Sequence, residues 1–189
     1  MKITGLNFSY PQEMIFKELE LTLLPNKLNV IVASNGRGKT TLFDILAGVI
    51  PSEYALSNVA YRTQKLRFSP YLTVRQLIEL YEKMGTSSIN KKYLAPLFEK
   101  YIAPKQKMKL GRLSGGQQQL ILNYATLLLE RDVYLLDEPL SQLDEEVATL
   151  FYEQLLELVK INQALFVLTE HDQHRLTNYA KQVNLITIK

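Results

Sequence analysis

The order of hydrophobic and polar positions predicts strands that alternate with helices at both ends of the chain. The first two strands are half polar, whereas the later ones are nearly continuous apolar runs, as is typical of a buried parallel sheet. The expected strands are residues 3–8, 19–23, 28–33, 59–63, 133–136, 165–169 and 183–188.

The middle of the chain, from about residue 70 to residue 129, is expected to be mainly helical. Thr73 can cap one helix and Gly85 can end it, while Pro96 argues against a single straight helix in its segment. The expected helices are residues 41–49, 73–84, 91–101, 115–130 and 145–160, with a loop at residues 86–88. These patterns together predict an α/β sheet domain with a helical insertion.

Composition narrows the range of functions. Hydrophobic residues make up 47% of the chain, which is enough for a substantial core. The net charge of +3 comes without a long basic run, so it does not argue for a nucleic-acid partner. The absence of cysteine excludes disulfides and thiolate metal sites, and it is compatible with a reducing cytoplasm.

Membrane insertion is not expected for this chain. No apolar run in the sequence is long enough to span a bilayer, and the first residues lack the apolar stretch of a secretion signal. A role at a membrane would therefore require docking on the transmembrane segments of another protein.

A glycine-bearing loop between an expected strand and an expected helix carries the strongest chemical signal. Gly36 and Gly38 let the backbone approach a ligand closely, and its N–H groups and the helix dipole suit phosphate oxygens. Lys39 can reach the β- and γ-phosphates, and Thr40 can supply a hydroxyl to Mg²⁺. The general pattern has glycine where this chain has Ala33, a position that could require a positive φ. The loop consists of Ala33, Ser34, Asn35, Gly36, Arg37, Gly38, Lys39, Thr40 and Thr41.

A buried strand ends in two adjacent carboxylates, Asp137 and Glu138. Ligands of α/β sheets bind at the carboxyl ends of strands. Asp137 can hold the hydration shell of Mg²⁺, and Glu138 can polarise an attacking water. By itself the pair is equally compatible with an exposed strand end, but together with the phosphate loop it favours hydrolysis.

Two adjacent glycines, Gly115 and Gly116, precede another expected helix. They leave N–H groups free at the helix start, and Ser114 adds a hydroxyl, so this is a second potential anion site. One nucleotide does not need two phosphate sites in one chain. The second site is therefore expected to serve the nucleotide of a partner chain.

The complete set resembles the ATP-binding cassette (ABC) ATPases over essentially the whole chain. Residues 113–117 match the signature of that family letter for letter, and residues 137–139 match the end of its Walker B motif and the residue after it. Residues 141–144 are similar to its D-loop. The Q-loop glutamine, the switch histidine and the aromatic residue that stacks on adenine correspond to Gln64, His171 and Tyr10.

The resemblance implies a P-loop NTPase core with a mostly parallel sheet, a small N-terminal antiparallel β part and an inserted helical subdomain. A single domain is expected over residues 1–189, with the core at about 1–69 and 130–189 and the helical subdomain at about 70–129. Only residues 40–63 separate Lys39 from Gln64, so the antiparallel part is expected to be trimmed.

The resemblance also implies a head-to-tail dimer, of two copies or of this chain with a related one, that encloses two ATP molecules with Mg²⁺. Residues implied to bind the chain's own ATP are Tyr10, Ser34, Asn35, Gly36, Arg37, Gly38, Lys39, Thr40 and Thr41. Residues implied to contact the other chain's ATP or the dimer interface are Ser114, Gly115, Gly116, Gln117 and Asp144. Catalysis is assigned to Glu138, His171 and Gln64, and Mg²⁺ binding to Thr40, Gln64 and Asp137.

Some single-residue assignments have plain alternatives. Tyr10 could be a surface tyrosine, Gln64 an ordinary loop amide and His171 a helix-cap histidine, while His174 is interpreted as a surface residue. The family more often has a small residue at the position of Arg37, which adds a cation beside the phosphates or at the dimer interface.

The main hypothesis is the ATPase subunit of a transporter with separate transmembrane subunits. By analogy it is expected to be an exporter, cytoplasmic and peripheral on the inner face of the cell membrane, with no nucleic-acid partner. The permease is expected to dock near residues 64–84, where exposed Tyr71 or Leu72 would fit. The alternatives are a soluble ATPase acting on nucleic acid or ribosomes, and a module that binds ATP without turnover, against which Glu138 argues.

Overall fold

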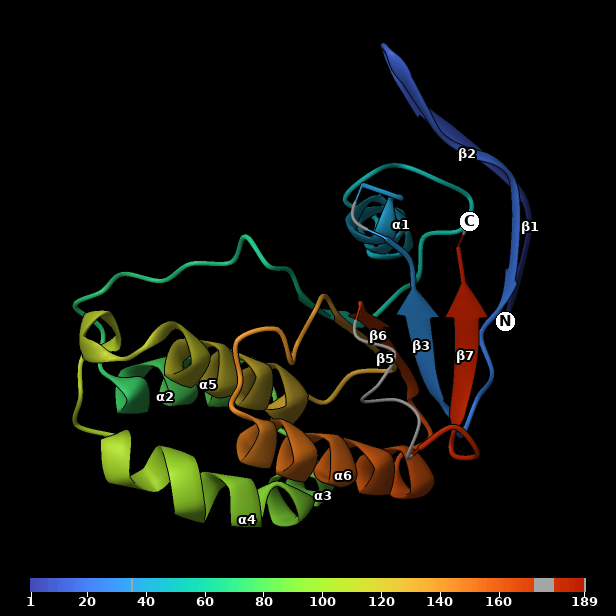
Figure 1. Ribbon diagram of the computed structural model, residues 1–189. Coiled ribbons are helices and arrows are strands. Elements are labelled where there is room, and N and C mark those ends of the chain that lie inside the picture. Colours follow the sequence, from blue (N-terminus) through green and yellow to red (C-terminus); the bar gives the residue numbers. More distant parts are fainter. Residues whose placement is uncertain (35, 172–178, 189) are drawn as a thin grey trace.

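The computed structural model describes residues 1–34, 36–171 and 179–188 of the 189-residue chain. A five-stranded sheet stands between one helix on one side and a layer of helices on the other (Figure 1). Every strand pair within it is parallel. In spatial order its strands are β4 (Val59–Arg62), β5 (Val133–Leu136), β6 (Leu165–Glu170), β3 (Leu28–Val32) and β7 (Val183–Thr187). The predicted parallel sheet is thereby confirmed.

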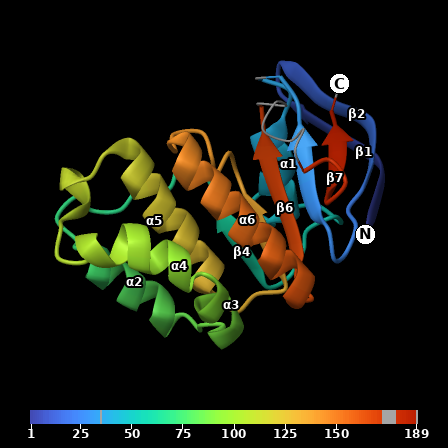
Figure 2. The same ribbon diagram turned by 60° about the horizontal axis from the view of Figure 1, so that its bottom comes forward.

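The N-terminal part is an antiparallel hairpin of β1 (Lys2–Tyr10) and β2 (Glu13–Thr22). Both strands are longer than expected, because their outward residues are polar and dilute the apolar signal. Register shifts interrupt the pairing at three places. Such shifts bend a strand pair and increase its twist, and both views show the hairpin beside α1 (Figures 1 and 2).

Both faces of the three central strands, β5, β6 and β3, are buried, which explains why these strands are nearly continuous apolar runs. Alternate residues of β3 belong to different hydrophobic clusters: Val30 and Val32 face the large helical layer, and Ile31 faces α1 (Lys39–Leu46) and the hairpin. The helical layer contains α6 (Glu145–Ile161) and the segment between β4 and β5.

The segment between β4 and β5 folds into α2 (Val74–Lys83), α3 (Ser88–Tyr93), α4 (Ala95–Leu97) and α5 (Gly115–Leu128). Thr73 caps α2, as the sequence predicts, and the cap is a reciprocal hydrogen-bond pair with Gln76. The expected helical segment over residues 91–101 is present but interrupted near Pro96, as the proline indicated, and it begins earlier than expected. Ser87 caps α3, so helix begins inside the expected loop at residues 86–88.

Pro96 divides the remainder of that expected helix. It lies in the first turn of α4, where proline's missing N–H does no harm. A short π-helix at Phe98–Ile102 and two 3₁₀ turns, Ala103–Lys105 and Leu110–Arg112, follow before α5. Within the ranges that the structure describes, no helix has the length and apolar character needed to cross a membrane.

A buried asparagine connects the helical layer with the sheet. Asn90 of α3 has no exposed surface, and its Nδ2 donates to Leu127 O at 2.7 Å and to Tyr134 Oη at 2.9 Å. Its Oδ1 accepts from Asn162 Nδ2 at 3.0 Å. One side chain thus connects α3, α5, β5 and the end of α6.

We expect Asn90→Ala to lower the free energy of unfolding by about 2–4 kcal/mol, because it leaves several buried polar groups without a partner. Urea denaturation of both proteins measures the difference. The matched control is Gln163→Ala, which truncates an exposed amide nearby and is expected to change stability by less than about 0.5 kcal/mol. Equal effects of the two substitutions would contradict the linking role.

Candidate functional site

The glycine-bearing loop runs from the carboxyl end of β3 to the start of α1. Gly36 and Gly38 have φ values of 79° and 80°, in the left-handed region that glycine tolerates best. Ala33 does not have a positive φ, and it is buried in the hydrophobic cluster beneath α1. The loop therefore accommodates alanine at this position without backbone strain.

Gly38 also lies against the hairpin. A Cβ atom built on Gly38 would stand 2.5 Å from Ile15 Cγ2 and 2.7 Å from Phe16 Cζ. At Gly36, by contrast, the described part of the chain has no atom within 4 Å of such a Cβ. The hairpin thus covers the loop at Gly38 but not at Gly36.

We expect Gly38→Ala to destabilise the protein more than Gly36→Ala does. Both substitutions force alanine to a positive φ, which costs roughly 1–2 kcal/mol, but only alanine at position 38 overlaps β2, which adds about 1–3 kcal/mol. Thermal unfolding of the two variants side by side measures the difference. Equal losses would show that β2 moves aside freely.

Lys39 lies between the ends of two parallel strands. It is 7% exposed, and its Nζ donates to Ala33 O at 2.8 Å. The same nitrogen lies 3.7 Å from Glu138 Oε1, at the end of β5. The ammonium is therefore held where phosphate oxygens that bind the loop would meet it.

Asp137 is at the centre of a buried hydrogen-bond cluster. Its two carboxylate oxygens each accept a hydroxyl at 2.8 Å, Oδ2 from Thr40 and Oδ1 from Thr169. The Thr169 Oγ1 in turn accepts from the backbone N–H of Glu138 at 2.8 Å. Burial raises the pKa of Asp137 above its ordinary value, against the two hydroxyls, which lower it.

The sequence reasoning assigned no role to Thr169. The parallel register pairs Leu136 with Leu168, so the next residues lie side by side, Asp137 just after β5 and Thr169 still within β6. This neighbourhood follows from the strand order, and a single sequence does not contain that order.

The residues around Thr40 fit a magnesium ion bound together with a nucleotide. The Thr40 hydroxyl and the Asp137 carboxylate offer adjacent hard oxygens, and a buried carboxylate gains from a nearby cation. The described residues contain no group of three or more histidine, cysteine or acidic side chains that could hold a metal alone. That composition suits Mg²⁺, which usually takes most of its ligands from phosphates and water.

Glu138 has a strained backbone. Its φ of 46° is unusual for a residue with a Cβ, and such strain often occurs at functional positions. Gln119 holds this turn, because its Nε2 donates to Glu138 O at 2.8 Å. One turn further along α5, Asn123 Nδ2 donates to Pro139 O at 2.7 Å.

Gln119 and Asn123 were missed by sequence reasoning. Both are buried, at 7% and 0% exposure, on a helix whose other buried residues are mostly apolar. Two amides four residues apart share one helix face. This spacing is the only signal in the sequence that could have indicated their supporting role.

A cavity of about 530 Å³ lies between the segment after β4 and the first turns of α5. Gln64, Glu138 and Gly115 all line it. The cavity thus brings together the predicted Q-loop glutamine and the predicted general base. Gln64 O accepts from Arg67 Nη1 at 2.7 Å, and the structure shows no hydrogen bond from Gln64 to the Thr40–Asp137 pair among the described residues.

The predicted signature forms the start of α5. Ser114 caps the helix, with its Oγ accepting from Gln117 N at 3.2 Å, and the Gln117 side chain accepts from Ser114 N at 3.3 Å. Ser114, Gln117 and Asp144 line a smaller hollow of about 180 Å³. In both ribbon views α5 begins on the side away from α1 (Figures 1 and 2). The fold therefore keeps the signature apart from the chain's own phosphate loop.

The two glycines of the predicted signature permit a close approach of residues 141–144, the predicted D-loop. A Cβ on Gly115 would lie 2.4 Å from Gln142 Oε1, and a Cβ on Gly116 would lie 2.2 Å from Gln142 O. The packing of a single chain therefore requires glycine at position 116, because a side chain there would clash with the backbone of Gln142. This requirement is independent of any contact that Gly116 makes with another chain.

Two single-residue predictions lie at the margins of the site. The His171 side chain is half exposed just after β6, and the backbone N–H of His171 donates to the buried Glu170 Oε1 at 2.8 Å. Tyr10 ends β1, is 45% exposed and has its ring centroid 5.0 Å from that of Phe8. Phe8 pairs with Phe16, the residue beside Gly38, so Tyr10 lies about 7 Å further along the hairpin.

Four of the remaining residues predicted for the site are either exposed or part of α1. Ser34 and Arg37 are exposed, with Arg37 N donating to Ser34 O at 3.3 Å, and Thr41 is buried in α1. Asp144 is exposed at the start of α6. Asn35 and His174 lie outside the described residues.

Comparison with known proteins finds relatives along most of the chain. A family model described as "ABC transporter" matches residues 16–141. The manganese transport system ATP-binding protein MntB of Listeria monocytogenes is 28% identical, over 100% of this chain and 87% of its own. The zinc import ATP-binding protein ZnuC of Ehrlichia chaffeensis is 26% identical, over 92% of this chain and 74% of its own. A solved structure of the ATP-binding subunit of an ABC transporter superposes with a TM-score of 0.82 at 18% identity, covering 99% of this chain and 85% of that one.

Proposed function

The chain belongs to the ABC transporter family of ATP-binding subunits, which hydrolyse ATP, and from this premise we propose that it powers a transporter whose membrane-spanning part is a separate protein. The observation that carries the proposal is the cluster at the ends of three neighbouring strands. The contacts described above bring five residues together there: Lys39, Thr40, Asp137, Glu138 and Thr169.

In the proposed mechanism the loop N–H groups and Lys39 hold the β- and γ-phosphates. Thr40 and Asp137 would hold Mg²⁺, which would supply positive charge beside the phosphate oxygens. Glu138 takes a proton from the attacking water, and its fixed backbone turn orients the carboxylate. Gln64 and His171 are proposed to contact the γ-phosphate region, Gln64 from the shared cavity and His171 from the end of β6.

The composite site is proposed to form between two chains placed head to tail. The support is the separation of the signature from the chain's own phosphate loop, together with the free N–H groups at the start of α5. Ser114, Gly115 and Gly116 would then close on the γ-phosphate bound by the other chain, and Asp144 would lie at the interface. The partner is a second copy or a related ATPase subunit.

The permease is proposed to dock near residues 64–84 and to hold the chain at the inner face of the cell membrane. Tyr71, which is 77% exposed, fits this role. Leu72 fits less well, because it is half buried against the helical core.

The chain is expected to divide into a core at about 1–69 and 130–189 and a helical subdomain at about 70–129. This division is proposed to let the docked part move against the nucleotide-binding part.

The direction of transport is proposed to be import. Export was the expectation from sequence, but the zinc relative is named as an import protein and the manganese relative as part of a transport system. The same relatives make a transport subunit the favoured function over a soluble ATPase that acts on nucleic acid or ribosomes.

The test is to purify the tagged chain from membranes of its own source, identify the co-purified transmembrane protein, and reconstitute both in vesicles. ATP hydrolysis that requires Mg²⁺ and is coupled to solute uptake is the expected result. Hydrolysis with no co-purified membrane protein would contradict the transporter assignment, and outward transport would contradict import.

A further inference from the structure

Thr169 is a polar residue in a core position. It lies in β6, is 0% exposed and pairs with Ile31 of β3. Val167, two residues earlier on the same face of the strand, belongs to the hydrophobic cluster beneath α1. A valine would fit these surroundings as well as threonine does, and a buried hydroxyl costs free energy unless it is hydrogen-bonded. The hydroxyl is tolerated here because it has polar partners.

The two hydrogen bonds of the Thr169 hydroxyl have fixed directions. A backbone N–H can only donate, so Oγ1 accepts from Glu138 N at 2.8 Å. The single hydroxyl proton is then available for Asp137 Oδ1, which lies 2.8 Å from Oγ1. Because a β-branched side chain has few rotamers in a strand, the hydroxyl keeps this orientation. One side chain thus connects the predicted magnesium ligand with the predicted general base.

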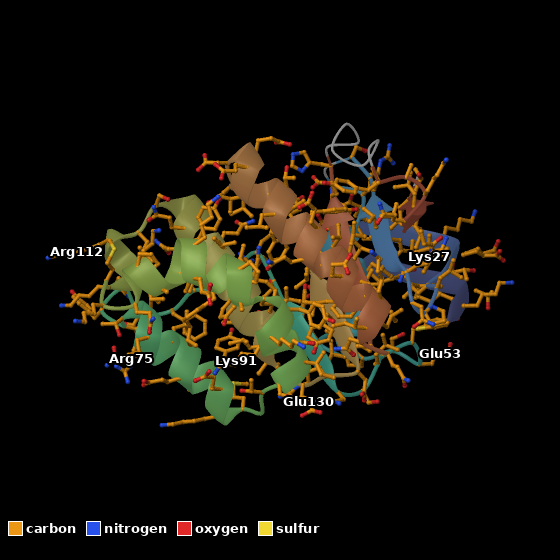
Figure 3. All side chains as sticks on the ribbon, turned by 90° about the horizontal axis from the view of Figure 1, so that it is seen from below. Lys27, Glu53, Arg75, Lys91, Arg112 and Glu130 are labelled. Atoms are coloured by element: carbon orange, nitrogen blue, oxygen red, sulfur yellow. The ribbon has the colours of Figure 1, made fainter. Side chains whose placement is uncertain are left out.

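The Asp137 carboxylate is held at both oxygens. Oδ2 accepts from Thr40 of α1 and Oδ1 from Thr169 of β6, each at 2.8 Å. Rotation of the carboxylate about its Cβ–Cγ bond would break both hydrogen bonds. Side chains such as Arg112 and Glu130 extend from the surface of the molecule (Figure 3), whereas Asp137 is 1% exposed. Bulk water therefore cannot replace a partner that Asp137 loses.

The Glu138 backbone is held at its N–H and at its carbonyl oxygen. The ladder between β5 and β6 ends at Leu136 and Leu168. The Glu138 N–H lies beyond this ladder and donates to the Thr169 side chain, while its carbonyl oxygen accepts from Gln119 Nε2 at 2.8 Å. A φ of 46° costs free energy for a residue with a Cβ, so the turn persists only because its surroundings hold it. The direction of the Glu138 side chain follows from this backbone.

We propose that Thr169 is a positioning residue for ATP hydrolysis, whose hydroxyl fixes the Asp137 carboxylate and the Glu138 backbone in one arrangement. The inference rests on the proposed function, because it takes Asp137 as the magnesium ligand and Glu138 as the general base. A misplacement of about 1 Å can cost roughly 100-fold in rate. Loss of the hydroxyl is therefore expected to affect hydrolysis more than ATP binding.

The first test removes the hydroxyl and keeps the shape of the side chain. We expect Thr169→Val to lower kcat about tenfold or more with a nearly unchanged KM for ATP, because only the hydrolytic groups lose their support. Thr169→Ser returns the hydroxyl and is expected to restore most of kcat. The matched control is Thr187→Val, which changes an exposed threonine of β7 and is expected to leave kcat unchanged.

Two results of this test would overturn the proposal. One is a kcat of Thr169→Val within about twofold of the wild type. The other is a loss that Thr169→Ser does not restore, because the shape of the side chain would then be responsible rather than its hydroxyl.

The second test measures the hydrogen bond itself, without nucleotide or metal. Hydrogen exchange followed by NMR reports on the Glu138 amide. We expect this amide to be protected in the wild type and in Thr169→Ser, and to exchange about tenfold faster or more in Thr169→Val. The wild type alone can overturn the inference, since an unprotected Glu138 amide in the folded protein would show that the hydroxyl does not hold this backbone.

A third measurement addresses the Asp137 carboxylate. Mg²⁺ is titrated calorimetrically into the chain with a non-hydrolysable ATP analogue bound. Thr169→Val is expected to bind Mg²⁺ about tenfold more weakly, as is typical when a supporting partner of a metal ligand is lost. Binding of the analogue without Mg²⁺ should be unchanged. Equal Mg²⁺ affinities of wild type and variant would overturn the proposal.

The outcomes separate this inference from the assignment of Glu138. If Glu138→Gln loses hydrolysis and Thr169→Val retains it, the general base stands and the positioning role is wrong. If Glu138→Gln keeps near-normal turnover, the general-base assignment is wrong, and the Mg²⁺ titration decides whether Thr169 positions Asp137.

Discussion

Glu138→Gln is expected to bind ATP with nearly unchanged affinity and to hydrolyse it about 100-fold more slowly or worse. The amide keeps the size of the side chain but cannot accept the proton of the attacking water. The backbone contacts from Gln119 and Thr169 hold the turn at this residue, so the fold is expected to persist. Single-turnover hydrolysis and filter binding of labelled ATP measure the two quantities separately.

The same variant is also expected to accumulate a dimer with ATP, because the closed state is left only after hydrolysis. Size-exclusion chromatography with and without ATP detects that dimer. The matched control is Glu130→Gln, an exposed carboxylate after α5, which is expected to retain activity. Near-normal turnover of Glu138→Gln in the reconstituted transporter would remove Glu138 from the role of general base.

Ser114→Arg is expected to abolish hydrolysis by the assembled protein, with a loss of roughly 100-fold or more, while one chain still binds ATP. The long side chain would fill the hollow beside Asp144 and would block the helix start from the other chain's nucleotide. Analytical ultracentrifugation with ATP should show a monomer, in contrast to the dimer of the wild type.

Ser57→Arg makes the same change at an exposed serine before β4 and serves as the control. It should dimerise on ATP as the wild type does. ATP-dependent dimers of Ser114→Arg would show that the signature does not act between chains.

The boundaries of most elements were predictable because apolar periodicity and capping residues agreed with each other. Thr73 and Gly85 enclosed α2 as expected, and the buried strands were recognisable from their nearly continuous apolar runs. The prediction failed at α3, where Ser87 acts as a cap although the preceding residues are typical of a loop. A serine in a polar stretch favours both structures about equally, and only packing of Asn90 beneath α5 decides between them.

The candidate site was predictable where a motif is contiguous in sequence, as in the phosphate loop and the Asp137–Glu138 pair. Its supporting residues were not, because Thr169, Gln119 and Asn123 reach the site from separate elements.

The contact between the signature glycines and Gln142 has a consequence for how this protein can change its sequence. No atom can be added at position 116 without displacing the backbone at position 142. The distance between the two segments is therefore fixed by their backbones. Because the obstacle is backbone, no side-chain change at position 142 can make room for a larger residue at position 116. Directed evolution of the protein should therefore retain glycine at position 116, while the exposed hairpin turn accepts substitutions.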